Sequence, residues 1–210
     1  MSYRILQACD AAYGESQRSD FTSIVTAARD LGFPTMKIHL LDVWQDRIPL
    51  EQVPAAIGAK FREWRPQWVG IENTLWQASI IQNMRRRGDV PFVEVDRRKA
   101  RNPDKKTRAG SLAFHYSEGH IWHPRPAPTT MRLFDGKSWL EGEAALRYAE
   151  DQLLAFTGVP GRDDHDDFVD AMIDVCDALS LTASWVQQQG PVYHNMTWDA
   201  PQQRKRLAYA

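Results

Sequence analysis

An aspartate-rich stretch in the last quarter of the chain has the residue types of a cation site. The sequence GRDDHDDFVDA, residues 161 to 171, holds five aspartates and one histidine in eleven positions. Carboxylates this close together repel one another unless a cation lies among them. Aspartates at the start of a helix are also favoured by the helix dipole and as caps. The stretch alone therefore leaves two interpretations, a cation site and a capped helix.

Two further acidic residues stand at the ends of predicted strands. Asp10 follows the strand expected at 3–9, and Glu72 follows the strand expected at 68–71. The ends of strands in open α/β sheets commonly carry the functional groups of such folds. If these two strands are neighbours, Asp10 and Glu72 lie side by side.

The spacing of the aspartates predicts one acidic helix face over residues 166 to about 186. At 100° per residue, one quarter of the helix circumference holds five of them: Asp166, Asp167, Asp170, Asp174 and Asp177. The rise along the helix places Asp174 roughly 10 Å from Asp167, too far to share an ion cluster. We therefore expect the first turn to form the site, and Asp174 and Asp177 to be solvated.

Three carboxylate sources that meet at one place suit hard divalent cations, which prefer oxygen ligands. Magnesium or manganese fits this set better than zinc, because no thiolate group and no set of histidines accompanies the acids. The sequence thus predicts a divalent-metal site formed by separate segments.

Hydrophobic periodicity supplies the elements that position these acids. Strands are expected at 3–9, 21–28, 35–44, 68–71 and 91–95, with Gly119–His123 as one arm of a hairpin. Helices are expected at 50–64, 77–87, 105–116, 141–156 and 166–186. Short links predict an antiparallel arrangement of the first three strands, and the intervening helices predict parallel pairing of the last two. The fold class is α/β, with a central mixed sheet of about five strands, three antiparallel and two parallel, flanked by helices.

Composition narrows the classes of protein that the chain can represent. Its 210 residues with 43% hydrophobic content suit one domain, expected at 1–189, followed by a loosely ordered tail at 190–210. Cys9 and Cys176 lie in apolar runs and are expected to be buried, reduced thiols. The N-terminus has no secretion signal, and no apolar run reaches the roughly 18 residues of a membrane span. These features predict a soluble protein that is not secreted.

A net charge of −1 conceals an uneven distribution of charge. The segment 85–108 holds ten basic and four acidic side chains, hence +6, so the rest of the chain carries −7. Such a segment suits the phosphate backbone of a nucleic acid, and an ordinary solvated surface is the alternative interpretation. No base-reading motif is present, which predicts weak sequence preference.

Four stretches taken together resemble the nuclease domain of the large terminase subunit of tailed bacteriophages, a ribonuclease H-like fold. They are CDAAYGESQRSDFTSIV at 9–25, WVGIENTLWQ at 68–77, RKARNPDKKTRAGSLAFHYSEGHIWHP at 98–124 and HDDFVDA at 165–171. Asp10, Gly14 and Asp20 match the first motif of the family, and Glu72 matches its middle acid. The aspartate pair Asp166 and Asp167 matches the last motif.

The resemblance implies hydrolysis of double-stranded DNA with two Mg²⁺ or Mn²⁺ ions. Asp10 is expected to bridge the ions, Glu72 to hold one and Asp167 the other, with Asp166 as a further catalytic and metal-binding residue. Auxiliary roles fall to Asp20 as a metal or water ligand, to Asp170, and to His165, which either positions water or phosphate or merely caps the helix. The expected DNA-binding residues are Arg97, Arg98, Arg101, Lys105, Lys106 and Arg108.

The chain lacks the phosphate-binding glycine loop of the ATPase domain that precedes the nuclease in full terminases. It therefore resembles the nuclease half alone, either an excised domain or a split protein. The resemblance implies work in the cytoplasm of an infected host, with an ATPase domain, the small terminase subunit and the capsid portal as partners.

Two other functions fit the same residues. One is a different ribonuclease H-like nuclease, such as a junction resolvase or a transposase core. The other is a non-catalytic module that docks on DNA, on a motor or on a portal, with the acids as its binding face.

Overall fold

The computed structural model describes residues 3–12, 21–32, 36–73, 77–95, 105–158 and 166–180. Its strands are β1 (Tyr3–Asp10), β2 (Thr22–Asp30), β3 (Ile38–Asp46), β4 (Val69–Glu72), β5 (Phe92–Val95), β6 (Ile121–Trp122), β7 (Arg132–Phe134) and β8 (Trp139–Glu141). Its α-helices are α1 (Val53–Trp64), α2 (Ala78–Arg87), α3 (Lys105–Ser117), α4 (Glu143–Ala155) and α5 (Asp167–Ser180), and a short 3₁₀ turn, Leu50–Gln52, precedes α1.

The strands form one mixed sheet in the order β5-β4-β1-β2-β3-β7-β8. β1, β2 and β3 are antiparallel neighbours, whereas β4 pairs in parallel with both β1 and β5. The predicted fold class is therefore confirmed. β1 and β4 are neighbours, as the placement of Asp10 beside Glu72 requires.

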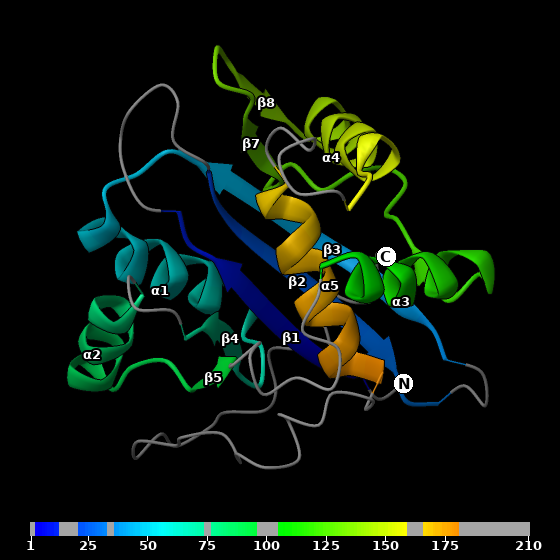
Figure 1. Cartoon of the computed structure of the whole chain (residues 1–210). Helices are drawn as coiled ribbons and strands as arrows, with labels where there is room; N and C mark the ends of the chain where they lie inside the picture. The colour runs from blue at the N-terminus through cyan, green and yellow to red at the C-terminus, as the bar shows by residue number, and fades with distance from the viewer. Residues whose placement is uncertain are drawn as a thin grey trace.

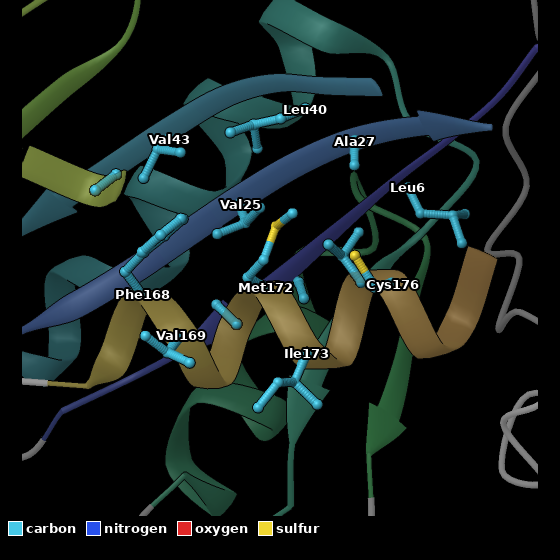
Figure 2. Close-up of a cluster of buried hydrophobic side chains, with 14 of the residues drawn as sticks. Leu6, Val25, Ala27, Leu40, Val43, Phe168, Val169, Met172, Ile173 and Cys176 are labelled. Carbon is cyan, nitrogen blue, oxygen red and sulfur yellow. The ribbon is translucent and has the colours of Figure 1, made fainter. Parts of the chain in front are cut away.

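Helices cover both faces of the sheet (Figure 1), which gives three layers, and the two larger hydrophobic clusters lie on opposite faces of the sheet. On one face, α5 lies across β1 and β2, and α3 and α4 pack beside it. Figure 2 shows Phe168, Met172 and Cys176 pointing from α5 toward strand residues such as Val25 and Leu6. On the other face, α1 and α2 pack on the sheet through side chains such as Phe61 and Ile80.

Local sequence explains where the helices on the second face begin and end. Pro54 lies in the first turn of α1, where its missing N–H leaves no hydrogen bond unmade. Gly88 ends α2 in the left-handed conformation at φ 63°, which a residue without a Cβ adopts at little cost. The predicted helix boundaries at 50–64 and 77–87 are confirmed to within three residues.

The sheet is wider than the sequence predicted. β6, β7 and β8 extend it beyond β3, and each has only two or three residues, too few to show a period-two pattern. The prediction that Gly119–His123 forms one arm of a hairpin is wrong, because β6 pairs in parallel with the start of β3. The hairpin of this region is β7–β8 instead.

Both cysteines are buried free thiols, as predicted, with Cys9 and Cys176 on opposite faces of the sheet. Burial raises the pKa of each thiol. Within the described ranges, no helix is long and apolar enough to cross a membrane. The domain boundary expected at 189 and the tail at 190–210 lie outside those ranges.

Candidate active site

Asp10 and Glu72 end two strands that lie side by side. The parallel register pairs Cys9 with Ile71, so Asp10 and Glu72 are the next residues on their strands. Both side chains are half-buried. The two acids that the sequence placed at strand ends therefore occupy adjacent positions at the carboxyl ends of β1 and β4.

Strand alternation places both acids on the face that α5 covers. Leu6 and Ala8 of β1, and Trp68 just before β4, belong to the core under α5. Residues of the other parity, Cys9, Val69 and Ile71, belong to the core under α1 and α2. Since successive side chains of a strand point to opposite faces, Asp10 and Glu72 point toward the α5 layer.

The start of α5 lies at the same end of the sheet. The backbone N–H of Phe21 donates a 2.9 Å hydrogen bond to Oδ2 of Asp167, a side chain that is 8% exposed. Phe21 directly precedes β2, and in the β1–β2 register Asp10 faces Ser23. Asp167 thus ties the first turn of α5 to the strand beside Asp10. Asp166 precedes the helix, and its carbonyl accepts a hydrogen bond from the Asp170 N–H at 2.9 Å.

Sequence reasoning did not find the Phe21 contact. The donor is a backbone amide, and backbone amides leave no mark on residue identity. The contact also joins positions 146 apart in the chain, so it depends on the completed fold.

The donor chemistry at this end of the sheet fits a hard divalent cation, since every candidate ligand is a carboxylate. In the part of the chain that the structure describes, however, no three His, Cys, Asp or Glu side chains are grouped closely enough to hold an ion. A shared site therefore requires the side chains of Asp10, Glu72 and Asp167 to turn toward one another when a cation binds.

Several predicted site residues lie outside the described ranges: Asp20, His165, Arg97, Arg98 and Arg101. The backbone of Lys105 begins α3, and Lys106 is exposed in the first turn of that helix. Lys106 is therefore accessible to a nucleic acid.

Arg108 occupies a different position from the DNA-facing one that the sequence predicted. It is 8% exposed, and its guanidinium lies 3.5 Å from Asp170 and 3.8 Å from Asp174 across the α3–α5 contact. Asp170 and Asp174 are themselves 6% and 5% exposed. The prediction that Asp174 is solvated is wrong because α3 covers the acidic face of α5, and we leave Arg108 out of the proposed DNA-binding surface.

Asp177 also lies in the α3–α5 contact, so the prediction that it is solvated is wrong. Ser111 of α3 donates a 3.2 Å hydrogen bond to its carboxylate. Burial, and secondarily the nearby Asp174 carboxylate, raise the pKa of Asp177 to about 6. A carboxyl group with a raised pKa stabilises the fold while protonated and loses that contribution as the pH rises through about 6.

Asp177→Asn should therefore stabilise the protein at pH 7.5 by about 1 to 3 kcal/mol. The gain should shrink below pH 6 and vanish near pH 3, below the ordinary aspartate pKa of about 3.9, where the wild-type carboxyl is protonated in both folded and unfolded chains. Urea unfolding at pH 7.5 and 4.5 measures it, with Asp151→Asn on the exposed side of α4 as control. A gain that is the same at both pH values contradicts the assigned pKa.

The sheet order, the paired strand-end acids and the helix that crosses them define a ribonuclease H-like fold. The same fold is seen in the human cytomegalovirus terminase nuclease domain, solved after a manganese soak with an inhibitor bound. The two chains superpose with a TM-score of 0.55 at 13% identity, over 84% of this chain and 82% of the viral domain.

The chain also shows a more distant similarity to two structures of RuvC from Thermus thermophilus. RuvC alone gives a TM-score of 0.41 at 14% identity, and RuvC in complex with a Holliday junction substrate gives 0.42 at 11%. Each comparison covers 85% of this chain and 98% of RuvC. Because both scores are below 0.5, the fold assignment rests on the viral domain. No protein-family model and no curated protein sequence matched the chain.

Proposed function

We propose that the chain is a divalent-metal-dependent endonuclease that cuts double-stranded DNA during viral genome packaging. One observation carries the proposal: Asp10 and Glu72 end adjacent parallel strands on the face that α5 covers, and Asp167 begins α5 at that same end. Three carboxylates from separate segments at one end of one sheet face suit divalent ions, which can assist the hydrolysis of a phosphodiester.

The positions of the three acids suggest a separate role for each in binding metal ions. Asp10, on the strand between β4 and β2, is central and would bridge two ions; Glu72 would hold one and Asp167 the other. When bound, Mg²⁺ or Mn²⁺ supplies the activation of water and the neutralisation of charge on the phosphate. Asp167 accepts a hydrogen bond from the Phe21 N–H. This contact holds the start of α5 against the start of β2, beside Asp10.

Asp166, Asp20 and His165 retain the supporting roles expected from the sequence. Asp166 directly precedes α5 and is half-buried, so it is available as a second acid of the pair. Asp170 faces Arg108, which assigns it to the α3–α5 contact rather than to the ion site.

The packaging role rests on the resemblance of the four sequence stretches to phage terminases and on the fold shared with a viral terminase nuclease domain. Within that role, the partners are DNA, a terminase ATPase domain, the small terminase subunit and a capsid portal.

Incubation of supercoiled plasmid with the protein tests the activity. The proposal predicts nicking and linearisation with millimolar Mn²⁺ or Mg²⁺ and none with EDTA. Linear, supercoiled and four-way-junction DNA at equal concentration separate a packaging nuclease from a junction resolvase, which would cut the junction faster. Plasmid that stays intact at high protein and metal concentration contradicts the enzyme and favours a binding module.

DNA binding should depend on the basic segment before α3. Replacing Arg97, Arg98 and Arg101 with glutamine should weaken binding uniformly across sequences and lower the slope of log K against log salt by about three. Fluorescence anisotropy over a salt series measures the slope. The control removes three exposed basic residues outside the 85–108 segment, Arg62, Lys137 and Arg147. An unchanged slope in the first triple variant removes these residues from the interface.

A further inference from the structure

Gln77 connects the two chain segments that leave the candidate site. It is 3% exposed, and its side-chain Nε2 donates a 3.0 Å hydrogen bond to the carbonyl of Ala11. Ala11 directly follows Asp10, and Gln77 comes five residues after Glu72. One side chain thus joins the exits of the two strands that carry the acids.

The segment after Asp10 is held on its other side as well. The Ala12 N–H donates a 3.3 Å hydrogen bond to Oγ1 of Thr22, a residue of β2 that is 1% exposed. Ala11 and Ala12 are therefore fixed between α2 and β2. The direction in which Asp10 leaves β1 depends on both contacts.

The segment after Glu72 is anchored independently. The Asn73 N–H donates to the carbonyl of Val95 at 2.8 Å, and its side-chain Nδ2 donates to Glu94 at 2.9 Å. This anchoring fixes Glu72 relative to β5 but not relative to Asp10. Beside the backbone pairing of β1 and β4, the hydrogen bond of Gln77 connects the segments that follow the two acids.

The position of Gln77 at the start of α2 does not explain why this residue has an amide side chain. Gln77 is the N-cap residue, and its carbonyl accepts the first helical bond from Ile81 at 3.0 Å, yet its side chain does not cap the helix. Its Oε1 is buried without a hydrogen-bond partner among the described residues. A buried, unsatisfied acceptor lowers stability, so methionine would serve packing alone better.

We propose that Gln77 is a positioning residue that sets the separation of the Asp10 and Glu72 carboxylates for a divalent ion. This inference rests on the proposed function. Groups behind metal ligands orient those ligands, and their loss typically lowers metal affinity or activity about 10- to 100-fold.

Gln77→Met keeps the shape of the side chain and removes the donor. It should raise the Kd for Mn²⁺, measured by calorimetry, about tenfold, and should raise the metal concentration for half-maximal plasmid cleavage by the same factor. The KM for DNA and the melting temperature should stay close to wild type. Gln77→Glu should impair metal affinity at least as much, because its carboxylate would face the Ala11 carbonyl oxygen.

Gln82→Met, on the exposed side of α2, is the matched control and should behave as wild type. If Gln77→Met does not fold, Gln77→Glu carries the test. A wild type that binds Mn²⁺ and cleaves DNA, beside a folded Gln77 variant with unchanged Kd, overturns the positioning role and leaves the nuclease intact. A wild type that neither binds Mn²⁺ nor cleaves DNA removes the proposed function, and this inference with it.

Discussion

Asp10→Asn should reduce metal-dependent cleavage of supercoiled DNA at least about 100-fold. Asp10 lies between Glu72 and the strand to which Asp167 is tied, so its loss removes the central carboxylate of the site. A bound ion contributes several kcal/mol of charge stabilisation, and roughly 3 kcal/mol corresponds to a factor of about 100 in rate. Initial rates of plasmid nicking at saturating Mn²⁺ measure the effect.

The asparagine variant should keep the wild-type fold, because Asp10 is half-buried at a strand end rather than in either core. Circular dichroism and the melting temperature check this, and Asp151→Asn serves again as the control for activity. A folded Asp10→Asn variant that cuts at the wild-type rate removes Asp10 from the catalytic set.

Lys60→Met should produce the largest loss of stability that we predict. Lys60 of α1 and Asp42 of β3 form a 2.7 Å ion pair, and the two residues are 8% and 1% exposed. Lys60 also donates to Glu63 and to the Thr130 carbonyl, both at 3.1 Å. Removing the lysine leaves a buried carboxylate with no cation, which costs about 3 to 5 kcal/mol.

The pH dependence of the stability of the Lys60→Met variant tests whether the buried Asp42 carboxylate causes the loss. Burial already raises the pKa of Asp42, against the opposing effect of Lys60, so the variant should raise that pKa further. A raised pKa means that stability is lost as the pH rises, and the deficit should shrink in acid as Asp42 takes up a proton. Adding Asp42→Asn should restore part of the stability. Urea midpoints equal to those of wild type, or of the exposed control Lys137→Met, contradict the account.

The layered fold could be predicted because its elements carry strong local signals. The segment Thr22–Val25 is rich in β-branched residues, and Val53, Ile57 and Phe61 have helical apolar spacing, so both elements are defined without tertiary context. The sequence placed Asp10 and Glu72 at strand ends, but their adjacency depended on β1 and β4 being neighbours, which the structure shows.

What the sequence could not predict depends on which surfaces meet. The acidic face of α5 looks solvated in isolation, and only the packing of α3 reveals that Asp174 and Asp177 are covered. In the same way, Arg108 belongs to a basic segment by sequence but to a buried contact by structure. Gln77 carries no motif, and its role is visible only through its bond to Ala11.

A crystal structure after a manganese soak tests the central claim most directly. We predict anomalous density for one or two Mn²⁺ ions bound by the carboxylates of Asp10, Glu72 and Asp167, with these side chains turned toward one another. Manganese bound only elsewhere, or none at millimolar concentration with the three carboxylates still apart, would contradict the shared site and with it the nuclease assignment.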